Sequence, residues 1–182
     1  MLFKRTIKWI FLIIMSLGLI GCRFVKPINP SKALEEYPIP KNSLDKIINE
    51  HVEPISVKPS FGGKPFCNYT IIGSDKNNNT IKIYLILLAQ EYYIKDDKLV
   101  EGTGGEFDGI LTIKQENNNY KFIDCNISQQ IQTEESIKIF PKHIRKKALK
   151  IHMESSSSDS SIKKIEKKAE TYFKKTVVKT YM

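Results

Sequence analysis

The chain has 182 residues, a formal net charge of +9 and 27% charged residues. Without its first 21 residues it keeps 161, which suits one domain of common size that buries about 68–70% of its unfolded surface. A core of this size holds without covalent staples, so the three cysteines are not required as a disulfide framework.

The N-terminal segment has the layout of an export signal. Lys4, Arg5 and Lys8 form a positive start, and an apolar run of 11 residues follows from Trp9 to Leu19. A bilayer-spanning helix needs about 20 apolar residues. The run is therefore too short for a permanent span and predicts a signal peptide over residues 1–21.

The apolar run ends in Leu19, Ile20, Gly21 and Cys22, which resembles the lipobox of bacterial lipoproteins. The resemblance implies cleavage between Gly21 and Cys22 and a lipid on the Cys22 thiol, often with an acylated amino terminus. Two long acyl chains anchor a protein stably, whereas one is marginal. We expect a protein held on the extracytoplasmic face of the cell membrane. An uncleaved anchor and a plain secretory signal with an incidental cysteine are the alternatives.

The predicted export also limits the classes of partner that the chain can meet. The mature chain keeps a formal charge of +6, because residues 1–21 hold three of the 29 basic residues and no acidic one. This mild excess favours anionic lipid or cell-wall polymer, and a position outside the cell argues against nucleic acid. Cys67 and Cys125 either form one disulfide or stay as two buried thiols.

Residues 22–42 contain four prolines and no sustained periodicity, so they predict a tether that follows the lipidated cysteine. A single domain is expected over residues 43–182. Ser43 is a good N-cap for a short helix with Leu44 and Ile48 on its apolar face. Pro54 is expected to end this helix.

Four strands are predicted next, over residues 67–73, 80–93, 109–116 and 120–127. The second strand is apolar on both alternating faces, so it is expected at the centre of the sheet. Three consecutive asparagines at 117–119 predict a hairpin between the last two strands.

The tail has helical periodicity. Thr133 is expected to cap a turn, and Pro141 begins a helix with Ile144, Ala148 and Ile151 on one stripe. A serine-rich break at 155–161 precedes a last helix that ends near residue 176. These elements predict an α+β fold: an N-terminal helix, a four-stranded antiparallel curved sheet and packing C-terminal helices.

Several segments resemble a poorly characterised clostridial domain. The most specific are the I-I-G of the first strand (71–73), the I-K-x-Y of the second (81–84) and the S-I-K-x-[IM]-F-P segment from Ser136 to Pro141. That domain occurs in small lipoproteins and at the extracytoplasmic end of BlaR-like antirepressor metallopeptidases, and the resemblance covers residues 43–178. It implies a cystatin-like or nuclear-transport-factor-like roll, surface attachment and envelope sensing, and it supplies no catalytic residues.

The chain also departs from that family. The turn that usually follows the fourth strand is replaced by "NISQQIQTEES", and no HExxH peptidase motif is present. A sensing role would therefore give this chain only the outer part of a signalling system.

The segment "EGTGGEFDG" (101–109) is a candidate ligand loop. Gly104 and Gly105 could turn backbone N–H groups toward an anion, and Glu101 and Asp108 could bind calcium. Neither a P-loop lysine nor EF-hand spacing accompanies them. A plain hairpin connection is the alternative.

Other patterns for chemistry or a cofactor are weak. His143 and His152 lie nine residues apart, which does not match a helical zinc pair, and a surface location is expected for both. No nucleophile-elbow motif occurs. Basic residues crowd the last two helices, either as a solvated face or as a patch for an anionic surface. They are Lys142, Arg145, Lys146, Lys147, Lys150, Lys163, Lys164, Lys167, Lys168, Lys174 and Lys175.

Taken as a whole, the sequence predicts a non-catalytic, membrane-anchored lipoprotein whose domain binds a ligand or an unidentified protein partner in the concave face of its sheet. No cofactor or metal is expected. An accessory or sensor protein of envelope-stress signalling is the first alternative, and an enzyme is the second.

Overall fold

The computed structural model describes residues 39–117, 119–131, 133–154 and 159–179. The expected signal peptide, Gly21, Cys22 and most of the 22–42 tether lie outside the described residues. Among the described residues, no helix combines the length and apolar character needed to cross a membrane.

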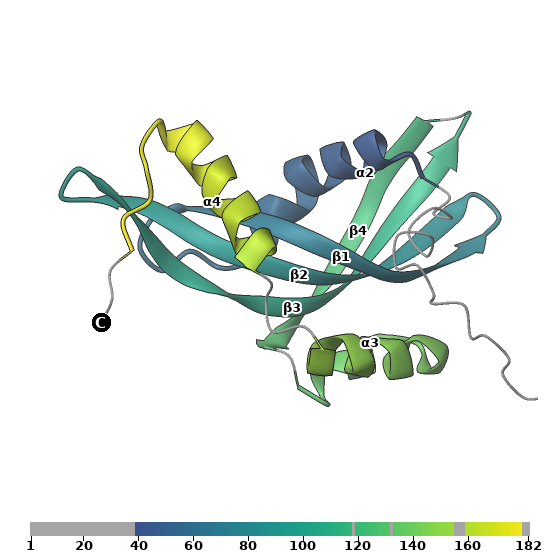
Figure 1. Cartoon of the computed structure of the whole chain (residues 1–182). Coiled ribbons are helices and arrows are strands. Elements are labelled where there is room, and N and C mark those ends of the chain that lie inside the picture. Colours follow the sequence, from purple (N-terminus) through teal and green to yellow (C-terminus); the bar gives the residue numbers. More distant parts are fainter. Residues whose placement is uncertain (1–38, 118, 132, 155–158, 180–182) are drawn as a thin grey trace, which may run out of the picture. The chain divides into compact units, whose positions relative to one another are not determined.

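The chain forms an N-terminal helix, a four-stranded sheet and two C-terminal helices (Figure 1). The elements are α2 (Lys41–Ile47), η2 (Ile48–Val52), η3 (Glu53–Ile55), β1 (Lys64–Asn77), β2 (Thr80–Lys95), β3 (Lys98–Glu116), β4 (Asn119–Ile131), η4 (Ser136–Ile139), α3 (Lys142–Glu154) and α4 (Asp159–Phe173). The strand order is β1-β2-β3-β4 with every neighbouring pair antiparallel. The predicted α+β class and antiparallel sheet are confirmed.

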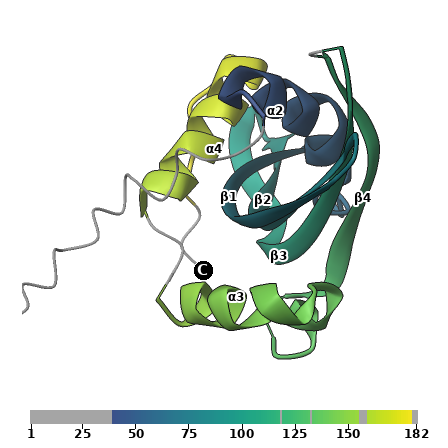
Figure 2. The same cartoon turned by 90° about the vertical axis from the view of Figure 1, so that its right-hand side faces the viewer.

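Strand β2 is buried on both faces, as its sequence predicts. Ile83, Leu85 and Leu87 are fully buried and belong to a core that includes side chains of α2 and η2. On the opposite face, Tyr84 and Ile86 belong to a second core formed with η4 and α3. Figure 2 shows α2 and α3 on opposite sides of the strands. Described side chains therefore cover both faces of β2. Ligand binding in the concave face of the sheet stays a prediction.

Helix α2 begins at Lys41, two residues before the predicted N-cap Ser43. Pro40 takes the N-cap position with an extended backbone. Ile39 is buried and holds the chain against the core just before the helix. The helix therefore begins earlier in the sequence than predicted. Pro54 lies inside the short η3 turn, which directly follows η2.

The C-terminal elements follow the predicted apolar stripes. Thr133 caps the turn as expected: its hydroxyl accepts a hydrogen bond from the Ser136 N–H at 3.0 Å. In α3, Ile144 and Ala148 are buried against the sheet. Helix α4 buries Ile165 and Ala169 in a third core with residues of β1, β2 and β3.

Candidate functional site

The predicted ligand loop lies inside strand β3. Glu101 pairs with Tyr92 of β2, and Gly104 and Gly105 pair with the next β2 residues along the ladder, Gln90 and Ala89. The remaining member of the set, Asp108, pairs with Ile86. Glu101 is exposed while Asp108 is fully buried, so the two carboxylates do not share a ligand. Among the described residues no group of side chains could hold a metal ion. The segment is therefore part of strand β3 and not a loop.

The glycines of this strand make room for neighbouring side chains. A Cβ on Gly102 would lie 2.7 Å from a carboxylate oxygen of Glu91, and one on Gly104 would lie 2.1 Å from the amide oxygen of Gln90. The Gln90 amide donates a 2.7 Å hydrogen bond to the Gly102 carbonyl. Glycine in a strand interior commonly marks such a close approach. The composition that indicated a flexible loop instead reflects tight packing.

Glu91 is a fully buried carboxylate that organises one end of the sheet. It accepts four backbone hydrogen bonds, from the N–H groups of Ser60 (2.9 Å), Phe61 (3.0 Å), Gly63 (2.8 Å) and Thr103 (3.1 Å). Burial alone would raise the pKa of Glu91, but the four donors outweigh it and hold the pKa below the usual value. One charged group thus fixes the loop at residues 60–63 to β2 and β3.

The loop that Glu91 holds has a defined shape. Gly62 has φ of +72°, which glycine adopts without strain. A Cβ on Gly63 would lie 2.3 Å from the carbonyl oxygen of Tyr92, so no larger residue fits there. The result is a fixed turn that directs Phe61 outward at the start of β1.

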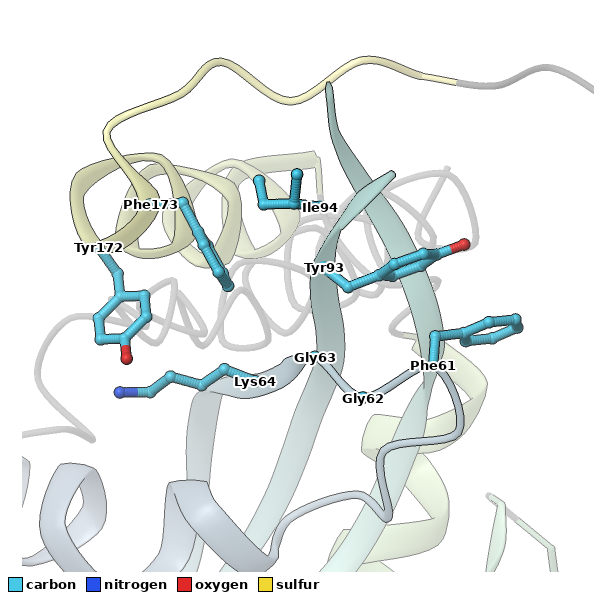
Figure 3. Close-up of a pocket in the computed structure, with 8 residues that line it drawn as sticks. All are labelled: Phe61, Gly62, Gly63, Lys64, Tyr93, Ile94, Tyr172 and Phe173. Atoms are coloured by element: carbon cyan, nitrogen blue, oxygen red, sulfur yellow. The ribbon is translucent and has the colours of Figure 1, made fainter. Parts of the chain in front are cut away.

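This turn forms one wall of a pocket of about 410 Å³ (Figure 3). The aromatic groove, as we name it, is lined by Phe61, Gly62, Gly63, Lys64, Tyr93, Ile94, Tyr172 and Phe173. Three elements contribute: the turn before β1 together with the first residue of β1, the end of β2, and the end of α4.

The rings of the groove are ordered by contacts with one another yet open to solvent. Phe61 stacks on Tyr93 with ring centroids 5.0 Å apart and ring planes 7° apart. The ammonium of Lys64 lies 3.9 Å from the ring centroid of Tyr172. Phe61 is 57% exposed and Tyr172 is 58% exposed. Large aromatic groups held in place at the surface indicate a binding site more than a packing role.

Asp108 belongs to a second buried polar cluster on the side of the sheet that α3 covers. Its carboxylate accepts a hydrogen bond from the Ser136 hydroxyl and lies 2.8 Å from Nε2 of His152. The His152 side chain is only 8% exposed, so its predicted surface location is wrong. His143 is 59% exposed, as predicted, and pairs with Asp75.

The Asp108 cluster does not have the geometry of a hydrolase triad. In a triad the histidine stands between the nucleophile and the acid. Here the carboxylate stands between Ser136 and His152, and the serine hydroxyl donates to Asp108 rather than to the imidazole. The arrangement attaches η4 and α3 to β3.

Cys67 and Cys125 are both free cysteines. Burial raises the pKa of each thiol to about 12, with a further contribution to Cys67 from the Glu53 carboxylate. Neither is an activated thiolate at neutral pH.

Several of the predicted surface lysines have structural partners. Lys168 donates to the Glu53 carboxylate (2.6 Å) and to the Cys67 carbonyl (2.9 Å), which joins α4 to η3 and β1. Lys175 pairs with Asp97 in the β2–β3 turn. These two belong to the fold and not to a free basic patch.

No family model, curated protein or solved structure gives a significant match to this chain. The resemblance to the clostridial domain, and the roll that it implies, stay predictions from the motifs.

Sequence reasoning did not identify the groove. Its members come from three distant segments, and only the fold brings Phe61, Tyr93 and Tyr172 together. One local signal was available: an aromatic residue followed by two glycines, between a helix and a strand, is a tight turn with an exposed ring. Tyr172 lies near the end of α4, and more than half of its surface is exposed.

Proposed function

We propose that this chain is a lipid-anchored extracytoplasmic binding protein whose aromatic groove binds a sugar ring of an acidic glycan. The anchor rests on the lipobox resemblance at Cys22. The binding role rests on the groove, where a buried carboxylate, four backbone donors and two glycines hold Phe61 in a solvent-exposed position. A ring fixed at the surface in this way favours a role in ligand binding over a role in the hydrophobic core.

The chemistry of the groove fits a sugar ring beside an anionic group. The C–H face of a pyranose stacks on flat aromatic surfaces. The groove offers the stacked Phe61–Tyr93 pair at one end and Tyr172 and Phe173 at the other (Figure 3). Lys64 is the cation of the lining, and no described carboxylate lies within ion-pair distance of its ammonium. A carboxylate or phosphate on the glycan would pair with it.

The side chains that line the groove suit binding and not catalysis. Lys64 and the hydroxyls of Tyr93 and Tyr172 are its titratable groups, and they do not form an acid–base pair or a nucleophile with a neighbouring base. Ser136, Asp108 and the His152 side chain are buried, so a substrate has little access to that cluster as an alternative catalytic centre.

Two measurements test the two halves of the proposal. Cys22→Ser should move the protein out of the detergent-extractable membrane fraction, and unchanged fractionation would contradict the lipid anchor.

For the groove, soluble muropeptides are titrated into the protein and the NMR spectrum of the protein is followed. Shifts should gather on Phe61, Tyr93 and Tyr172, and Phe61→Ala should weaken binding at least tenfold. The matched control is Ile123→Ala, an exposed side chain on β4 away from the groove. Shifts elsewhere, or equal affinity in Phe61→Ala, would contradict it.

A further inference from the structure

The outward face of α3 combines basic and apolar side chains. Lys142, Lys146 and Lys150 follow one another at a spacing of four, so they form one row on the helix surface. Leu149 and Met153 form the adjacent row, each three residues after a lysine of the first. The two rows lie opposite the stripe that packs on the sheet.

The apolar row is more exposed than the apolar stripe by which the same helix packs on the sheet. Met153 is 75% exposed and Leu149 is 36% exposed, while Ile144 and Ala148 are 7% and 0% exposed. In Figure 2, α3 lies on one side of the strands, and beyond it the picture shows only the loop that leads into the N-terminal end of the helix. Most of the surface of Met153 and about a third of that of Leu149 are therefore open to solvent.

The basic row repels itself. Lys142 and Lys146 have no described carboxylate within ion-pair distance, and Lys150 has only Glu154 at 3.7 Å. Like charges four residues apart destabilise a helix. An anionic surface facing the row would remove that repulsion and add attraction.

We propose that the outer face of α3 docks on an anionic lipid surface, with Lys142, Lys146 and Lys150 at the headgroups and Leu149 and Met153 inserted below them. A row of lysines beside a row of large apolar side chains is the composition of a helix that lies in a membrane interface. A soluble polyanion would use the lysines alone, so the exposed leucine and methionine favour the lipid.

The anchor places this face within reach of a membrane. Sixteen residues separate Cys22 from Ile39, and a chain of that length spans at most about 55 Å. A domain of about 140 residues has a radius of gyration of about 14 Å. Any face of the domain can therefore meet the surface to which Cys22 is attached. The inference depends on the anchoring and not on the glycan groove.

The test uses the full exported chain, held in lipid vesicles by the lipid on Cys22, and an environment-sensitive fluorophore on Met153→Cys. The lipidated sulfur of Cys22 does not react with the fluorophore. Cys67 and Cys125 react slowly because burial raises the pKa of both thiols, and the parent without Met153→Cys measures their background. In phosphatidylcholine vesicles that contain phosphatidylglycerol, the emission should shift to the blue and an aqueous quencher should lose several-fold of its effect. In phosphatidylcholine alone, neither change should occur.

Matched variants distinguish lipid docking from the binding of a soluble polyanion. Lys142→Glu with Lys146→Glu should abolish the shift, whereas Lys163→Glu with Lys164→Glu, the same charge change on α4, should leave it. Leu149→Ser should reduce it. A fluorophore on Glu50→Cys, an exposed residue of η2, should stay in water. Three results would each overturn the proposal: no shift at position 153, an equal shift at position 50, or a salt-sensitive shift at position 153 that Leu149→Ser does not reduce. The third result would indicate a site for a soluble polyanion.

Discussion

Two buried carboxylates stabilise opposite regions of this molecule by different means. Among the described residues, Glu91 accepts from backbone N–H groups alone, and it fixes the turn that forms the aromatic groove. Asp108 is paired in that part of the chain with two side chains, Ser136 and His152, and attaches η4 and α3 to the sheet. Backbone donors point in one direction, whereas a hydroxyl rotates and an imidazole changes tautomer. The groove therefore depends on a rigid network and the α3 side on an adaptable one.

The largest effect is expected for Glu91→Gln. The amide can accept from some of the four N–H groups, but its NH₂ faces the others and the negative charge is lost. We expect the free energy of unfolding to fall by about 2–4 kcal/mol, since hydrogen bonds to charged groups are worth about 1.5–3 kcal/mol each. Urea denaturation measures the loss. A change below about 1 kcal/mol would mean that the Glu91 network is not rigid.

The second prediction concerns pH. The pKa of Glu91 is held below its usual value of 4.5, because the four backbone donors outweigh the effect of burial. The unfolded chain therefore binds a proton at this site before the folded chain does, and stability falls as pH falls below about 4.5 toward the folded pKa. Denaturation at a series of acidic pH values should show this loss, and Glu91→Gln should remove that part of it. Parallel profiles for the two proteins would contradict the assignment.

Asp108→Asn should have a smaller effect. The new amide oxygen can still accept from the Ser136 hydroxyl, and its NH₂ can donate to Nε2 of His152 in the tautomer that accepts there. We expect a loss of about 1 kcal/mol, within the ordinary range for a neutral hydrogen bond. Asp108→Ala provides the comparison, because it leaves both partners buried without an acceptor. An asparagine variant as unstable as the alanine variant would show that the cluster does not adapt.

Phe61→Ala should change stability least. The ring is more than half exposed, so its removal should shift the free energy of unfolding by no more than about 0.5–1 kcal/mol. The same substitution should remove glycan binding. Thermal unfolding and the muropeptide titration together make the check, with Phe66→Ala as the buried contrast in the third core. A large stability loss in Phe61→Ala would make the ring part of the core instead of the site.

Elements with a strong period were predictable from local sequence. The alternation around Ile83 and Tyr84 indicated a strand buried on both faces, and the stripe of Ile144 and Ala148 indicated the packing face of α3. These patterns arise from burial against whatever lies opposite, so the partner need not be known.

The two carboxylate networks were not predictable in the same way. The glycines of β3 indicated a loop because their purpose, space for Glu91 and Gln90, depends on which strand lies beside them. His152 indicated a surface residue because its partner Asp108 lies 44 positions away. Contacts of this kind are set by the register of the sheet and the docking of α3, which no local pattern encodes.

The affinity of Glu91→Gln for a muropeptide is the sharpest test of the link between the buried carboxylate and the groove, because this variant leaves every residue of the groove lining in place. NMR signals of Ile144 and Ala148 on the α3 side would first confirm that the domain is folded. If a rigid carboxylate network shapes the groove, binding should weaken at least tenfold and the Phe61 ring signals should broaden or move. Wild-type affinity with unchanged Phe61 signals would contradict that link.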